Sequence, residues 1–155
     1  MDARAARVAA LDMLARRDHS SGDLGRKLRD LGYDAALVGA VLERLLGEKL
    51  LDDSRYIDNF IRYHAARGQG PLRVRAQLRQ VGLQGALIED ALGAFPDWLG
   101  VARNARLRKF GPKSPESATD RARQARFLGY RGFTSAQIRG ALGLDIDLTA
   151  DDDGL

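Results

Sequence analysis

Apolar residues return along this chain at helical spacing, and three stretches of the pattern are alike. In each stretch a leucine lies four residues before a glycine, and a valine or isoleucine lies six residues after it. The glycines are Gly32, Gly82 and Gly132, at a constant period of 50 residues. Such spacing suits two short amphipathic helices that pack together, and a glycine between them can adopt the positive φ that ends a helix. The pattern predicts one helical unit repeated three times.

Each unit accommodates three predicted helices, and no stretch has the alternation of a strand. The expected fold is therefore all-α, with three tandem three-helix repeats that form an elongated, curved array. The expected ranges are 1–49, 50–96 and 97–144 for the repeats, 111–117 for a loop insertion in the third, and 145–155 for an acidic tail. The insertion follows from the distance between Gly111 and Gly132, which is seven residues longer than the matching segments of the first two repeats.

Two details of the pattern concern the core. Three apolar residues are expected to face inward from the first helix: Val8, Leu11 and Leu14. One position of the repeat is apolar in the first two repeats, where it is Leu24 and Val74, but polar in the third, where it is Gln124. The third repeat therefore looks degenerate, as terminal repeats often do.

Composition narrows the class of protein. The 155 residues include no cysteine, which removes disulfides and thiolate metal sites and fits a reducing cytoplasm. The first residues lack the apolar core of a signal peptide, and no segment approaches the ~18 consecutive apolar residues of a membrane span. We expect a cytoplasmic monomer with no membrane contact.

Charge is distributed unevenly along the chain. The net charge is +4, but residues 97–144 contain 10 basic and 3 acidic residues, and residues 145–155 contain five aspartates and no base. This asymmetry indicates a polyanionic partner and an acidic tail, expected to be disordered, that masks or tunes the cationic repeat.

A search for catalytic chemistry finds no candidate set. His19 and His64 lie in different repeats without metal-ligand spacing, so local hydrogen bonding and packing explain them better. Asp52 and Asp53 are adjacent at a helix start, where capping is the expected role. The glycine-rich segment 68–71 lacks the spacing and the lysine of a phosphate loop. The sequence therefore indicates a protein that is not an enzyme and has no cofactor or metal.

Basic residues give the stronger signal. Residues 62–79 contain five arginines and no acidic residue, and a second basic cluster follows in the third repeat. The candidate binding residues are Arg62, Arg67, Arg73, Arg75, Arg79, Arg103, Arg106, Arg108, Lys109, Arg123, Arg126 and Arg131. Arginines in such clusters suit phosphates or a carboxylate-rich protein groove equally well. Aromatic residues are too sparse beside them for a strong single-strand stacking platform.

Several segments also resemble a known family. They are Ala15-Arg-Arg-Asp-His-Ser20, Leu50-Leu-Asp-Asp-Ser-Arg-Tyr56, Arg67-Gly-Gln-Gly-Pro-Leu-Arg-Val74, Arg108-Lys-Phe-Gly111 and Gln124-Ala-Arg-Phe-Leu128. In this order and at these intervals they look like the signature segments of bacterial RecX proteins, and the similarity covers nearly the whole chain up to residue 144. The acidic tail is not part of that pattern.

The resemblance implies a regulator. RecX-family proteins are built from tandem three-helix units, lodge in the groove of the RecA–DNA filament, and restrain its ATP hydrolysis, strand exchange and co-protease activity. The implied partners are the RecA filament and the single- or double-stranded DNA within it. Two other classes stay open, a free-standing helical DNA-binding protein and a structural scaffold for another protein.

Overall fold

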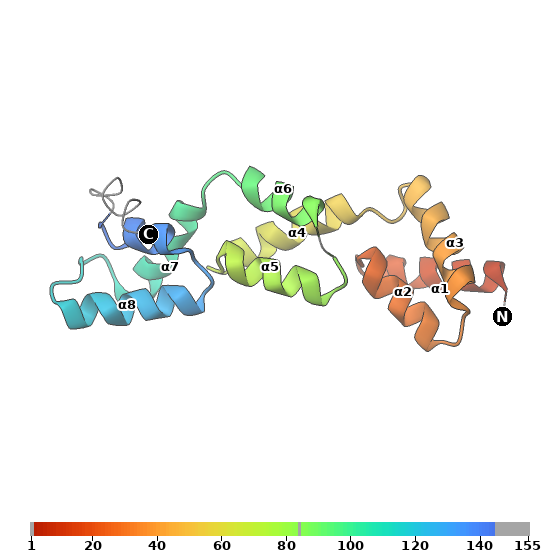
Figure 1. The fold of residues 1–155 in the computed structure, drawn as a ribbon, viewed down its shortest axis with the longest axis horizontal. Helices are drawn as coiled ribbons and strands as arrows, with labels where there is room; N and C mark the ends of the chain where they lie inside the picture. The colour runs from red at the N-terminus through yellow and green to blue at the C-terminus, as the bar shows by residue number, and fades with distance from the viewer. Residues whose placement is uncertain (1, 84, 145–155) are drawn as a thin grey trace. The chain divides into compact units, whose positions relative to one another are not determined.

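The computed structural model of the chain describes residues 2–83 and 85–144, so the acidic tail at 145–155 lies outside the described residues. Within the described part, nine helices and no strand are present (Figure 1). The helices are α1 (Ala3–Arg16), α2 (Ser21–Asp30), α3 (Ala35–Gly47), α4 (Asp53–Ala66), α5 (Pro71–Gln80), α6 (Ala86–Ala94), α7 (Trp98–Phe110), α8 (Ala118–Tyr130) and α9 (Ser135–Ala141). The all-α prediction, with three helices in each repeat, is confirmed.

The periodic glycines and the apolar columns have the predicted roles. The φ angles are +102° at Gly32, +84° at Gly82 and +94° at Gly132, so each glycine occupies the left-handed region after its helix. The leucines four residues earlier are fully buried in all three repeats: Leu28, Leu78 and Leu128. One apolar column and one turn residue therefore define the same local structure three times.

Side-chain caps fix where the helices begin. Ser20 Oγ accepts a hydrogen bond from the backbone N–H of Asp23 at the start of α2. Thr134 and Gln137 form both hydrogen bonds of the predicted capping box at the start of α9.

The first helix differs from the prediction in which face it buries. Val8 is 62% exposed, and Leu11 and Leu14 are only partly buried. The buried residues of α1 are Ala6 and Ala10, one turn apart. With 3.6 residues per turn, residue 8 lies on the opposite side of the helix from both alanines. The inward orientation expected for Val8 is wrong, because the small alanines form the packing face.

The described residues form two compact units, and the middle repeat contributes to both. The N-terminal unit contains residues 2–59 and 77–91, and the C-terminal unit contains residues 60–76 and 92–144. In the N-terminal unit the core is made by α1, α2 and α3 with Leu51, and in the C-terminal unit a cluster around Ala102, Leu128 and Phe133 holds α7, α8 and α9 together.

A turn of one repeat docks on the helix start of the repeat before it, and in the C-terminal unit the contact is made by the backbone. The N–H of Gly70 donates to the carbonyl of Arg131 at 2.7 Å, and the N–H of Leu72 donates to the carbonyl of Gly132 at 2.9 Å. A Cβ on Gly132 would lie 2.4 Å from Cβ of Arg73. Leu72 is the first residue of α5 that has an N–H, which lacks a partner inside the helix and is satisfied by this contact. We call this contact the C-terminal junction.

The N-terminal unit contains the equivalent contact 50 residues earlier. Ser20 Oγ, fully buried, donates to the carbonyl of Val81 at 2.5 Å. A Cβ on Gly22 would lie 2.9 Å from Cα of Gly82, so two glycines allow the close approach. We call this contact the N-terminal junction.

Candidate anion-binding site

Three segments of the C-terminal unit converge around one cavity of about 240 Å³. The turn after α4 supplies Arg67, α7 supplies Arg108 and Lys109, and the end of α8 with its following turn supplies Phe127 and Arg131. None of the described residues that line the cavity is acidic. We call the cavity and its four cationic side chains the cradle. It can attract and hold an anion.

Aromatic rings hold the cationic side chains of the cradle in place. The guanidinium of Arg67 lies 3.5 Å from the ring centroid of Tyr63, and that of Arg131 lies 5.1 Å from the ring centroid of Phe127. Lys109 Nζ lies 5.7 Å from the same Phe127 ring. Attraction between a cation and an aromatic face restrains these side chains before any ligand arrives. The cradle is therefore partly preorganised.

Backbone contacts restrain the two arginines further. Arg131 donates to the carbonyl of Arg67 at 3.4 Å, and Arg67 donates to the carbonyl of Tyr63 at 3.3 Å. Each guanidinium has five N–H donors, so most of them remain available to an anion. Gly68 has φ +78°, and a Cβ there would lie 3.5 Å from the Arg108 guanidinium, so a residue without a side chain keeps this wall open.

The other predicted basic residues lie in the C-terminal unit, except for Arg79. Arg79 belongs to the N-terminal unit and lies 4.0 Å from the carboxylate of Glu89. Arg73 donates to the carbonyl of Tyr130, and Arg123 forms a 2.8 Å ion pair with Asp120. The hydrogen bond from Arg123 holds the pKa of the Asp120 carboxyl below its ordinary value. The remaining predicted residues lie on helices α4, α5, α7 and α8: Arg62, Arg75, Arg103 and Arg126.

Arg106 has a different environment from the other predicted residues. It is buried, and its guanidinium donates to the carbonyls of Gly111 and Lys113 and to the side-chain carbonyl of Gln124. Gln124 is the polar residue in the otherwise apolar column, and it also donates to Asp120. Arg106 therefore holds the 111–117 loop, and we assign it a structural role.

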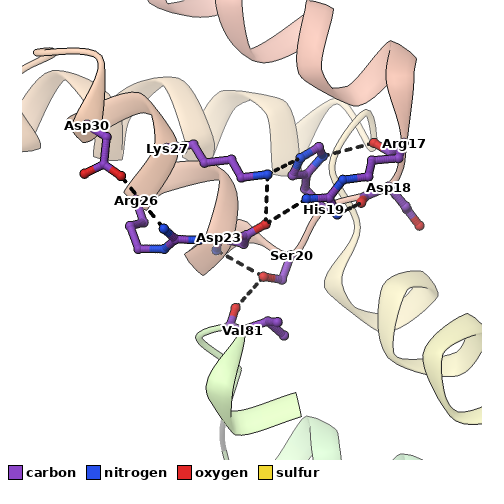
Figure 2. Close-up of polar contacts among 9 residues, drawn as sticks. All are labelled: Arg17, Asp18, His19, Ser20, Asp23, Arg26, Lys27, Asp30 and Val81. Carbon is purple, nitrogen blue, oxygen red and sulfur yellow. Dashed lines mark hydrogen bonds and ion pairs between the residues drawn. The ribbon is translucent and has the colours of Figure 1, made fainter. Parts of the chain in front are cut away.

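In the N-terminal junction a buried carboxylate lies among cationic side chains (Figure 2). Asp23 bonds to Arg26, and its carboxylate lies 3.6 Å from Lys27 Nζ and 3.7 Å from the guanidinium of Arg17. Asp53 completes this junction by accepting hydrogen bonds from the backbone and the hydroxyl of Ser21. The cations of this junction therefore have an internal partner.

Burial and charge shift the titration of two groups in this cluster. Burial alone raises the pKa of Asp23, but the hydrogen bond from Arg26 and the charges of Lys27 and Arg26 outweigh it, so the pKa lies below its ordinary value. Burial and the charge of Arg17 lower the pKa of His19. His19 Nδ1 lies 3.0 Å from the carbonyl of Arg17, and Nε2 lies 3.2 Å from Lys27 Nζ, a geometry that suits a neutral ring.

His64 packs against the rings of Phe60 and Tyr63 on α4. Among residues 2–83 and 85–144, no group of three or more His, Asp or Glu could hold a metal ion. Within the same residues, no helix has both the length and the apolar character needed to cross a membrane.

The aromatic contacts of the cradle were missed at the sequence level, although a signal for them exists. Tyr63 precedes Arg67 by four residues, and Phe127 precedes Arg131 by four residues. This spacing brings side chains together on a helix. The approach of α7 to both pairs, by contrast, depends on tertiary packing.

Comparison with family models finds all three repeats in order. The matched models describe the first three-helix domain of RecX at residues 6–45, the second at 52–92 and the third at 97–142. A regulatory protein RecX of Halorhodospira halophila is 45% identical over 138 residues, which cover 88% of this chain and 86% of the relative. One from Pseudomonas savastanoi is 47% identical over 130 residues, covering 83% and 84%. These relatives are named as regulatory proteins, not as enzymes.

Solved structures show the same fold. A crystal structure of RecX from Lactobacillus salivarius has a TM-score of 0.80 at 18% identity, covering 94% of this chain and 97% of that one. A second crystal structure, of a regulatory protein RecX, has a TM-score of 0.74 at 23% identity and covers 91% and 71%. Together with the family models and the curated relatives, the three repeats show that the chain belongs to the RecX family.

Proposed function

We propose that this chain binds the RecA nucleoprotein filament and inhibits the ATPase, strand-exchange and co-protease activities of RecA. It would act in the cytoplasm, as a monomer, during homologous recombination, DNA repair and the SOS response. The observation that carries the proposal is the match of all three repeats, in order, to RecX domains. The cradle supports it, because a nucleoprotein filament presents both phosphates and carboxylates to a cationic surface.

Repeated weak contacts provide a physical route to regulation. Predicted cationic residues lie on four of the described helices and on the turns beside them, so the chain can make several contacts with one filament. Each contact raises the effective concentration for the next, and the total affinity exceeds that of any one contact. A regulator of this kind alters the filament by staying bound to it and needs no catalytic group.

Binding to bare DNA is the second candidate function, and the cradle favours it as well. One experiment separates the two: the affinity of the chain for bare single-stranded DNA and for RecA–DNA filaments, each at two salt concentrations. A filament regulator binds the filament more tightly, and the preference persists at the higher salt because protein contacts remain. A free-standing DNA-binding protein gives equal affinities that fall together with salt.

A further inference from the structure

The two junctions occupy equivalent places in the repeats but differ in charge. At a period of 50 residues, Arg17 corresponds to Arg67, and Asp23 corresponds to Arg73. In the N-terminal junction the carboxylate of Asp23 is the anion on which Arg17, Arg26 and Lys27 converge (Figure 2). The C-terminal junction retains the first arginine and replaces the carboxylate with a second arginine.

The replacement leaves the C-terminal junction rich in positive charge. Arg73 donates to the carbonyl of Tyr130, the residue next to Arg131, so its positive charge adds to those of the cradle. The carbonyls of Arg67 and Tyr63 restrain the guanidinium groups of Arg131 and Arg67 without neutralising them. Repulsion among the four cations of the cradle is relieved when an anion binds between them.

We propose that the cradle, whose described lining has cationic and no acidic side chains, binds a backbone phosphodiester of DNA. The inference rests on the proposed function and names the part of the nucleoprotein filament that this site contacts. Arg67, Arg108 and Arg131 present planar guanidinium groups, whose paired donors match the oxygens of a phosphate.

Charge and size both favour a phosphodiester of a polymer. One carboxylate would neutralise only one of the four positive charges of the cradle. A nucleic-acid strand supplies further negative charges, because phosphates lie on each side of the one that is bound. The cavity, of about 240 Å³, has room for a phosphate with its ester linkages. Cations cover the Phe127 ring, so the site reads charge and not base identity.

The test compares two double variants of the full chain. Arg108→Gln/Lys109→Gln removes two cradle charges from exposed positions of α7, and Arg4→Gln/Arg44→Gln removes two charges from exposed positions of α1 and α3. The probe is a fluorescein-labelled single-stranded oligonucleotide, read by anisotropy over a salt series. The cradle variant is expected to bind at least about tenfold more weakly at low salt. Its salt slope should fall by about 1.4, at ~0.7 for each of two lost contacts. The control variant should stay within about twofold of the unaltered chain.

Two further arms identify the source of the phosphate. An oligonucleotide with uncharged methylphosphonate linkages should bind the unaltered chain and the cradle variant equally. Inorganic phosphate at constant ionic strength should not displace the DNA, and saturable displacement would instead assign the cradle to a free phosphate. If the α7 changes lower the thermal midpoint, Arg67→Gln removes a charge outside the helices and must reproduce the loss.

The outcomes separate this inference from the proposed function. Unchanged binding of bare DNA by the cradle variant overturns the phosphodiester assignment, and weakened binding of the filament by the same variant would then assign the cradle to RecA carboxylates. If the unaltered chain fails to bind the filament, the proposed function is overturned, while the result with bare DNA still decides what the cradle binds.

Discussion

Replacing Gly132 with alanine tests how the repeats are joined. The change places a Cβ 2.4 Å from Cβ of Arg73 and 2.6 Å from its backbone nitrogen, and backbone atoms cannot move aside as a flexible side chain could. The turn must withdraw, and the hydrogen bonds from Gly70 and Leu72 to the turn are then lost. Each lost hydrogen bond costs ~1–1.5 kcal/mol, and alanine at positive φ costs ~1–2 kcal/mol. The total is about 3–5 kcal/mol.

Gly143→Ala is the matched control for this prediction. Gly143 follows α9 with φ +78°, as Gly132 follows α8 with φ +94°, but a Cβ on Gly143 would have no atom within 4 Å, so only the conformational cost of about 1–2 kcal/mol applies. Urea unfolding followed by circular dichroism gives both free energies of unfolding, and hydrogen exchange reports the two amides directly. Gly132→Ala should cost at least about 2 kcal/mol more than the control and should expose the amides of Gly70 and Leu72. Equal costs, or unchanged protection of these amides, would refute the docking of the turn on α5.

Two further predictions concern the polar groups inside the units. Asp23→Asn should lower the free energy of unfolding by about 1–3 kcal/mol at neutral pH. Because the pKa of Asp23 in the folded chain lies below the ordinary 3.8, the difference from the unaltered chain should begin to close as pH falls below 3.8 and close fully below the folded pKa. Urea unfolding over a pH series measures this difference, and a constant difference would contradict this origin. The lowered pKa of His19 affects stability at higher pH. As pH falls below about 6.5, His19 is protonated in the unfolded chain before it is protonated in the folded chain, so the free energy of unfolding should begin to decline there. His19→Gln should remove that part of the decline. Arg106→Leu should lower the free energy of unfolding by about 1–3 kcal/mol because Gln124 and the loop carbonyls lose their donor. The double variant Arg106→Leu/Gln124→Leu should recover part of this loss, because it restores the apolar column of the repeat. A double variant less stable than the single one would show that the loop contacts dominate.

The repeats could be predicted from the sequence because they depend on local rules. A buried leucine four residues before a glycine at positive φ recurs at Gly32, Gly82 and Gly132, and both features follow from helix geometry. Val8 was misassigned because a large apolar residue carries more weight in a pattern than alanine, although Ala6 and Ala10 make the contact.

The sequence names the basic residues that line the cavity, but it does not show that they lie together. Counting charges finds Arg67, Arg108 and Arg131, but only packing of α7 against the turn after α4 and the end of α8 brings them around one cavity. The burial of Arg106 could not be predicted either, because it depends on tertiary packing beside the buried Gln124. The acidic tail and its expected masking role lie outside the described residues and stay a prediction.

Titration of the chain into a RecA ATPase assay on single-stranded DNA tests whether the chain regulates RecA. We expect ATP hydrolysis by RecA to fall as the chain is added, at or below one chain per RecA protomer, and the chain to hydrolyse no ATP when RecA is omitted. RecA turnover that stays unchanged with the chain in excess would contradict the proposed function.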